Sequence, residues 1–188
     1  MTKTSLKPVL FRLIKYLIVI AGALFVFYRI NTRQVVVDGD TLIIGREKIR
    51  FNNIDAPEMS QLCLCKGEQV KCGVKSKEAL YKFIGSNKVS CEPSGRDFYG
   101  RLIAECFIQA DGQKTSLNTL MIRSGMAIVI SKHDEPLLLE EIKAIQQKVG
   151  FWACEGFEDP AAFRKTAPPI KSADPPAPEP EQPLLQSG

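Results

Sequence analysis

Three segments of the sequence place acids and arginines among apolar residues. They are Asp38-Gly39-Asp40-Thr41, Arg50 followed by Asp55-Ala56-Pro57-Glu58, and Asp97-Phe98-Tyr99-Gly100-Arg101. A carboxylate that lies among apolar strand residues needs a cation or a metal ion as its partner. Asp40 and Asp55, at the mouths of adjacent strands, could share one hard cation such as Ca²⁺, which binds roughly six to eight oxygen atoms.

Two arginines and one further acid complete a set of residues that suits phosphodiester hydrolysis. Arg50 and Arg101 each present a planar fork of donors, and this geometry fits the oxygen atoms of a phosphate. Glu58 follows a proline turn and is free to act on a water molecule. A divalent metal ion and two arginines would stabilise the charge that accumulates on the phosphate oxygens during hydrolysis.

Each of these segments also has a purely structural explanation. Asp-Gly-Asp is common in Asx turns, and Asp55-Ala56-Pro57-Glu58 could simply begin a loop. Arg50 could pair with Glu47 or Glu58 on a solvated face. The functional hypothesis therefore depends on the joint order and spacing of the segments.

The elements that must position these residues follow from hydropathy and turn residues. Apolar alternation predicts a strand over 34–44, interrupted by Asp38-Gly39-Asp40, with a hairpin partner over 47–54. The remaining strands are expected at 88–92, 102–109 and 126–130, and the helices at 70–84, 116–123 and 135–149. Residues 55–73 are expected to form a loop. Short strands interleaved with three helices predict a small α+β barrel, and the lack of regular βαβ spacing argues against a parallel sheet.

The positive charge of the chain lies at its N-terminus. The 188 residues carry a formal net charge of +4. Six of the 25 basic residues, and none of the 21 acidic ones, fall within residues 1–33, whereas residues 34–165 are balanced. Bulk charge therefore predicts nothing about what the folded domain binds. We expect one domain at 34–165, preceded by the basic and apolar segment 1–33 and followed by a proline-rich, disordered tail at 166–188.

The N-terminal segment predicts a membrane anchor. Residues 16–28 carry no charge but span only about 20 Å as a helix, less than a bilayer core of roughly 30 Å. Extension back to Val9 includes Arg12 and Lys15, whose long side chains could reach the headgroups. We expect an uncleaved anchor, with a cleaved secretory signal peptide as the alternative, because the small residues are poorly placed for cleavage. More basic residues precede the apolar run than follow it, which places the domain outside the cytoplasm, in the periplasm or the extracellular space.

All six cysteines follow this segment, and their even number in an exported domain favours disulfides. Cys91 and Cys106 flank the turn near Phe98-Tyr99, so antiparallel strands would bring them together. Three others, Cys63, Cys65 and Cys72, form a cluster, and one of the first two could reach Cys154. A zinc site is the alternative, but paired C-x-x-C spacing is missing and His133 is distant.

Four motifs together resemble the staphylococcal nuclease (thermonuclease) family: VVDGDTLII, IRFNNIDAPE, DFYGRLIA and LNTLMIRSGMA. The resemblance covers roughly residues 34–153, and the motifs follow the order of the family. It implies an OB-fold, a five-stranded Greek-key β-barrel with three helices, and Ca²⁺-dependent hydrolysis of DNA and RNA. The cysteines and the apolar segment resemble an exported, disulfide-containing branch of the family.

The resemblance also implies a metal site. Asp40 and Asp55 would bind Ca²⁺ through their carboxylates, and Ala56 would add its backbone carbonyl oxygen. Thr41 and Asp38 would support this site. The family's best-known member has threonine in place of Ala56, which should change little because the ligand is a backbone atom.

The resemblance further assigns the catalytic roles. Glu58 would be the general base, Arg50 and Arg101 would hold the scissile phosphate, and Tyr99 would approach the neighbouring phosphate. Phe98 stands where the family has a lysine and Ser131 where it has a tyrosine. Both differences leave the choice between endonucleolytic and exonucleolytic cleavage open.

The main hypothesis is a monomeric nuclease that is anchored to the membrane. One alternative is a catalytically silent OB-fold module that tethers nucleic acid or protein at the membrane. A structural envelope protein is another. Neither alternative needs three carboxylates beside two arginines, and acids repel a polyanion, so the sequence favours hydrolysis.

Overall fold

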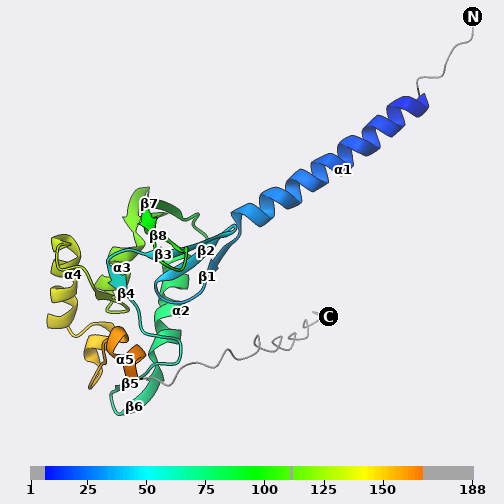
Figure 1. The fold of residues 1–188 in the computed structure, drawn as a ribbon. Coiled ribbons are helices and arrows are strands. Elements are labelled where there is room, and N and C mark those ends of the chain that lie inside the picture. The colour runs from blue at the N-terminus through cyan, green and yellow to red at the C-terminus, as the bar shows by residue number, and fades with distance from the viewer. Residues whose placement is uncertain (1–6, 111, 167–188) are drawn as a thin grey trace, which may run out of the picture.

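The computed structural model describes residues 7–110 and 112–166 as a mixed α+β protein. A long N-terminal helix, α1 (Lys7–Thr32), leads away from a body in which strands and shorter helices pack together (Figure 1). The proline-rich tail that the sequence predicts lies outside the described residues, apart from Thr166. The helices of the body are α2 (Cys72–Ile84), α3 (Leu117–Arg123), α4 (Glu135–Gln146), α5 (Pro160–Thr166) and the 3-10 helix η1 (Gly150–Ala153).

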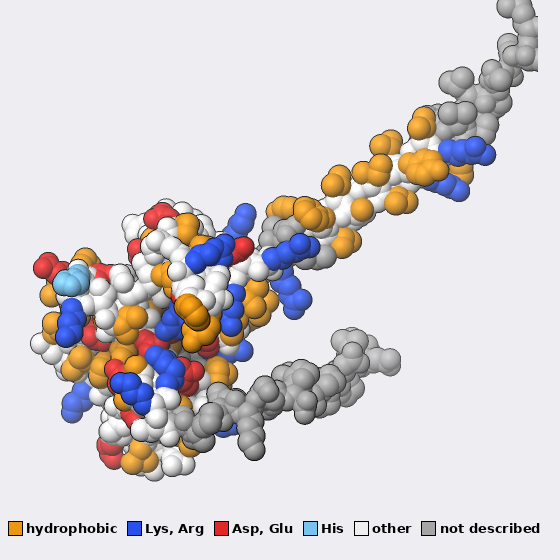
Figure 2. All heavy atoms as spheres, in the orientation of Figure 1, with side chains coloured by type: hydrophobic (Ala, Val, Ile, Leu, Met, Phe, Trp, Pro, Cys, Tyr) orange, Lys and Arg blue, Asp and Glu red, His pale blue; other side chains and the backbone are white. Residues whose placement is uncertain are grey.

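Helix α1 is long and apolar enough to cross a membrane. Its 26 residues span about 39 Å. The stretch Phe11–Tyr28 has a mean hydropathy of 1.9, and none of it is buried against the rest of the protein. Hydrophobic side chains cover the helix along its length, with basic side chains near both ends (Figure 2). A signal sequence has the same properties, so the structure supports an anchor and a signal equally.

The main sheet contains six strands, of which five follow the order β1-β2-β3-β8-β7 and the sixth, β9, pairs with β8. Pairing runs from β1 at one end to β7 at the other, so the described strands form no closed barrel. Strands β3 and β8 are parallel, although the spacing of the sequence argued against parallel pairing. The strands of this sheet are β1 (Gln34–Val36), β2 (Thr41–Ile44), β3 (Glu47–Phe51), β7 (Ser90–Arg96), β8 (Leu102–Ala110) and β9 (Gln113–Ser116).

The single interrupted strand predicted over 34–44 is wrong, because this segment folds back on itself. Strand β1 pairs with β2 in an antiparallel hairpin, with Gln34 opposite Ile44 and Val36 opposite Leu42. Asp-Gly-Asp lies in the turn between the two strands, so its polar side chains do not have to be accommodated within a strand. The predicted pairing with the following strand is confirmed, since β2 and β3 are antiparallel.

A second hairpin occupies part of the loop predicted over 55–73. It consists of β5 (Leu62–Cys65) and β6 (Glu68–Lys71). Lys66 and Gly67 form its turn with φ of 55° and 80°, the left-handed conformation that tight hairpins require. The remaining small sheet pairs β4 (Ile54–Asp55) with β10 (Ile128–Val129).

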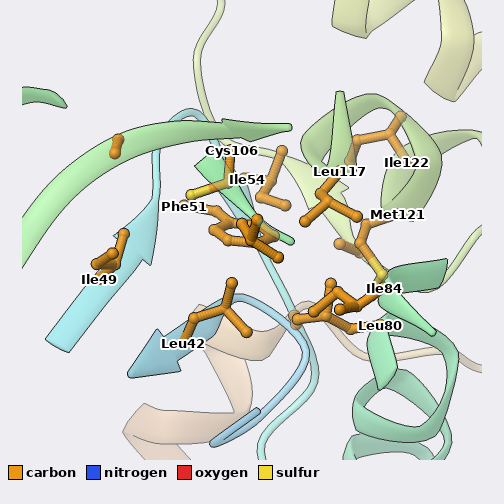
Figure 3. Packing of buried hydrophobic residues seen from close by; sticks show 14 of the residues in the cluster. Leu42, Ile49, Phe51, Ile54, Leu80, Ile84, Cys106, Leu117, Met121 and Ile122 are labelled. Atoms are coloured by element: carbon orange, nitrogen blue, oxygen red, sulfur yellow. The ribbon is translucent and has the colours of Figure 1, made fainter. Parts of the chain in front are cut away.

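The core lies between the sheet and the helices α2 and α3 (Figure 3). Leu42 and Phe51 from the sheet, Leu80 from α2 and Met121 from α3 are each at most 1% exposed. Burial of such a side chain contributes about 1.5–3 kcal/mol. Helix α3 is capped by Ser116, whose side chain accepts the backbone N–H of Thr119, a standard N-cap. This packing leaves the β1–β2 turn and β4 beside the N-terminus of α2.

Three disulfides join all six cysteines. Cys91 pairs with Cys106 across β7 and β8, as predicted. Cys65 reaches Cys154, which resolves the choice that the sequence left open, and Cys63 pairs with Cys72.

We expect the Cys65–Cys154 bridge to contribute more to stability than Cys91–Cys106. A cross-link restricts the unfolded chain, and the two bridges separate residues by 89 and 15 positions. The loop-entropy relation gives about 4.5 and about 3 kcal/mol for these lengths. Urea unfolding of the two paired alanine variants (C65A/C154A and C91A/C106A) measures this difference. An unchanged melting curve after complete reduction of the parent protein would contradict any stabilising role of the disulfides.

Candidate active site

The β1–β2 turn places Asp40 in the interior of the protein. Asp40 is 2% exposed, and its backbone N–H donates to the carboxylate of Asp38 over 3.1 Å. Gly39 permits the close packing of this turn. A Cβ atom at Gly39 would lie 1.8 Å from Oγ of Ser76 in α2 and 2.7 Å from Cβ of Ala56. Contact between backbone and helix at this point therefore fixes the position of the Asp40 carboxylate.

Three donors bind the carboxylate of Asp40. The hydroxyl of Thr41 donates to Oδ1 over 2.9 Å, the N–H of Ala56 donates to Oδ2 over 2.9 Å, and Nη1 of Arg50 donates to Oδ1 over 2.7 Å. Burial raises the pKa of Asp40 to about 7, while Arg50 and the N–H of Ala56 act in the opposite direction. Cationic partners are thus what this buried acid needs in order to carry its charge.

Arg50 joins Asp40 to Asp55. Nη2 of Arg50 donates to Oδ1 of Asp55 over 2.5 Å. The two carboxylates are 3% and 2% exposed, and the Arg50 side chain is 19% exposed. Burial would lower the pKa of Arg50, but both carboxylates outweigh it and raise that pKa above its usual value. The single positive charge of Arg50 does not balance two ionised carboxylates, so Asp40 and Asp55 together need a further cation.

Arg164, which no motif of the sequence marked as a site residue, supplies a second guanidinium. Its Nη2 donates to Oδ2 of Asp55 over 2.7 Å, and its Nη1 donates to Oε1 of Glu58 over 2.6 Å. These hydrogen bonds, that with Asp55 foremost, raise the pKa of Arg164. Figure 2 shows basic and acidic side chains side by side on the face that carries α5. An Asp-Pro pair begins this helix, and that start signal was present in the sequence; nothing local indicated where the helix would dock.

The backbone around Glu58 is held from two sides. The N–H of Glu58 donates to Oε1 of Gln61 over 3.2 Å, and Nε2 of Gln61 donates to the carbonyl of Glu158 over 2.7 Å. Gln61 is fully buried. On the other side, a Cβ atom at Gly73 would lie 2.0 Å from the carbonyl oxygen of Glu58. The N-terminus of α2 therefore packs directly against the backbone of the predicted general base.

The remaining predicted site residues lie in the turn between β7 and β8. Nε of Arg101 donates to Oδ2 of Asp97 over 2.6 Å, and its backbone N–H donates to Oδ1 over 2.9 Å. Arg101 lies one residue before β8, and strand alternation places it on the same face as Ile103, which pairs with Arg50. Tyr99 is 82% exposed. The structure thus gathers Asp40, Arg50, Asp55 and Glu58 into one cluster. Arg101 and Tyr99 lie in the separate β7–β8 turn, with Arg101 on the face of the sheet that carries Arg50.

The acidic cluster fits a hard divalent cation by the chemistry of its donors. Asp40 and Asp55 already share one positively charged group, and Asp55 and Glu58 share another. All of the atoms offered are oxygens, which suits Ca²⁺ or Mg²⁺ rather than a soft metal. Within residues 7–110 and 112–166, no group of three or more His, Cys, Asp or Glu is arranged to hold a metal ion.

A separate pocket of about 1050 Å³ lies between β1, β2 and α2. Its lining includes Arg33, Lys77, Tyr81 and Lys82. None of the predicted site residues lines this pocket. The acidic cluster, not this cavity, is therefore the candidate active site.

Comparison with known proteins adds a family and one relative. The family described as "Staphylococcal nuclease homologue" matches residues 48–154. The "Succinoglycan biosynthesis protein ExoI" of Rhizobium meliloti (strain 1021) is 42% identical over 95 residues, which is 50% of this chain and 48% of that protein. The chain thus spans about half the length of this relative. Arg50, Asp55, Glu58 and Arg101 lie within the residues that the family matches, whereas Asp40 and Arg164 lie outside them.

Proposed function

The chain belongs to the Staphylococcal nuclease homologue family, and on this premise we propose that it hydrolyses phosphodiester bonds of DNA or RNA with Ca²⁺. The observation that carries the proposal is the convergence of Asp40, Asp55 and Glu58 around the guanidinium groups of Arg50 and Arg164. Burial of Asp40 and Asp55 is costly, and the three acids together repel a polyanion. Their presence is explained if they bind a metal ion next to a phosphate group.

The OB-fold of the family is part of this proposal. The five-strand path β1-β2-β3-β8-β7 supports it, because an OB-fold is a five-stranded, partly open Greek-key barrel. Helices α2, α3 and α4 would be its three helices. Helices α1 and α5 would then be additions at the two ends of the domain.

Asp40 and Asp55 would hold the Ca²⁺ ion, with the backbone carbonyl of Ala56 as a further ligand and with support from Thr41 and Asp38. When bound, the ion supplies positive charge that stabilises the oxygens of the phosphate. The position of Ala56 supports this role, since its N–H already binds the Asp40 carboxylate. Buried ligands such as these lose little side-chain freedom when they bind an ion.

Glu58 would accept the proton of the attacking water molecule. Its side chain is 37% exposed, so water can reach its carboxylate. The side chains of Asp40 and Asp55 are instead almost completely shielded from solvent. Arg50 would stabilise the negative charge of the transition state through its fixed guanidinium. Arg101 would bind the same phosphate from the neighbouring turn, and Tyr99 would approach the adjacent phosphate.

We further infer that the domain works outside the cytoplasm as a monomer. The apolar helix α1 and the three disulfides support this location. Retention of α1 would anchor the protein in the membrane. Removal of α1 as a signal would release it.

A cleavage assay with the full chain in detergent tests the proposed function. Supercoiled plasmid and single-stranded DNA are incubated with Ca²⁺, with Mg²⁺ or with EGTA. We expect cleavage in Ca²⁺ and none in EGTA, because removal of the ion leaves the phosphate charge without its main stabiliser. Intact substrates in Ca²⁺, with a folded protein, would contradict the proposal.

The second candidate, a silent nucleic-acid-binding module, is favoured by one observation. Arg164 neutralises part of the acidic cluster, so the cluster repels a polyanion less than three bare acids would. Retarded migration of intact DNA in the presence of the protein would support this candidate over hydrolysis.

A further inference from the structure

Arg164 occupies the carboxylate oxygens that a metal ion and a water molecule would need. Oδ2 of Asp55 accepts Nη2 of Arg164 over 2.7 Å, and Oδ1 of Asp55 accepts Nη2 of Arg50 over 2.5 Å. Oε1 of Glu58 accepts Nη1 of Arg164 over 2.6 Å. With this guanidinium in place, the metal ligand Asp55 and the base Glu58 are both bound to a cation that belongs to the protein itself.

The segment before α5 is fixed to the body of the protein. The Cys65–Cys154 disulfide attaches it to β5, and the N–H of Glu155 donates to the carbonyl of Leu64 over 2.7 Å. The Phe157 ring stacks on that of Phe151, with centroids 5.5 Å apart. These contacts hold α5 next to the acidic cluster. The docking of Arg164 therefore costs little additional conformational entropy of the chain.

Helix α5 itself is held less firmly. It has seven residues, and so short a helix is marginal on its own in water. Its N-terminus is capped by Asp159, which accepts the N–H groups of Ala161 and Ala162. Arg164 near its other end has a side chain that is 42% exposed. Because the segment before α5 is fixed and α5 itself is only marginally stable, the Arg164 guanidinium can leave the cluster while residues 154–158 remain in place.

We propose that α5 is an autoinhibitory strap whose Arg164 guanidinium competes with a divalent cation for Asp55 and with the attacking water molecule for Glu58. This inference rests on the proposed metal-dependent function of the same cluster. In the docked state the strap satisfies the acids and blocks the base. In the undocked state the acids are available to the ion. The apparent association constant for Ca²⁺ therefore equals the intrinsic constant multiplied by the fraction of molecules in the undocked state.

Calorimetric titration of the full chain with Ca²⁺, in detergent, tests the competition without a nuclease assay. The R164A variant should bind Ca²⁺ at least about tenfold more tightly than the parent, if nine-tenths or more of the parent is docked. The matched control is K165A, which removes the same charge from the adjacent, exposed position of α5 and should stay within about twofold of the parent. Equal affinity in R164A and the parent would overturn the strap and leave the proposed nuclease standing.

Amide hydrogen exchange of the parent protein gives a second readout that needs no variant. Saturating Ca²⁺ should speed exchange in residues 160–166 and not in α2, because ion binding releases the strap. A general change in electrostatics would not produce this local effect. Unchanged or slower exchange in α5 upon Ca²⁺ binding would overturn the strap. No Ca²⁺ binding by either protein would overturn both the strap and the proposed function.

Discussion

Glu58→Gln should lower the rate of phosphodiester cleavage by about 10²–10⁴-fold. Glutamine keeps the size and the hydrogen-bonding reach of the side chain but cannot take a proton from water. Stability should change by less than about 1 kcal/mol, since the interaction that is lost is a partly exposed ion pair with Arg164. Single-turnover cleavage in saturating Ca²⁺, together with urea unfolding, measures both effects.

Glu68→Gln is the matched control, because Glu68 is an exposed acid in β6 and its replacement changes the net charge equally. We expect it to cleave like the parent. Cleavage by the Glu58 variant at the parental rate would show that another group, or hydroxide alone, deprotonates the water. A loss of activity that tracked a loss of folded protein would remove Glu58 from the catalytic set as well.

Arg50→Ala should reduce both stability and activity, whereas Arg101→Ala should reduce activity alone. Removal of Arg50 leaves the buried carboxylates of Asp40 and Asp55 facing each other without their shared cation. The loss of one partner from a buried pair typically destabilises a protein by about 3–5 kcal/mol. Arg101 instead pairs with Asp97 in a turn where its side chain is 25% exposed, and its loss should be worth about 1 kcal/mol or less.

Ca²⁺ provides an internal check on this difference. An ion bound between Asp40 and Asp55 replaces part of the charge of Arg50, so saturating Ca²⁺ should recover part of the stability of the Arg50 variant. Cleavage should not recover, because the ion does not take the place of the guanidinium on the phosphate. Urea midpoints measured with Ca²⁺ and with EGTA decide the point. Equal unfolding free energies for the two arginine variants would show that the cluster does not need Arg50.

Local patterns predicted much of this fold. The helices near 70–84, 116–123 and 135–149 are present because an apolar face and a capping residue mark each of them within a few positions. The Cys91–Cys106 bridge was predictable for a similar reason, since the residues between them form a simple hairpin. Such features need no information about distant parts of the chain.

Other features depended on contacts that no local pattern encodes. The β1–β2 hairpin was missed because Asp38-Gly39-Asp40 was interpreted as an interruption and not as a turn. The parallel pairing of β3 with β8 joins segments about fifty residues apart. Arg164 contacts residues 109 and 106 positions away. Its sequence neighbours gave no sign of this, because an exposed arginine near the end of a helix is common on any surface.

The junction of α1 with the sheet has a spatial consequence. Helix α1 ends at Thr32 and β1 begins at Gln34, so a single residue, Arg33, separates them. A tether of one residue reaches only about 3.5 Å. In the proposed anchored form, the active site would stay within one domain diameter of the bilayer and would move sideways with the lipid. Polynucleotides passing through or lying along the membrane would then be cut in preference to those in the bulk solution.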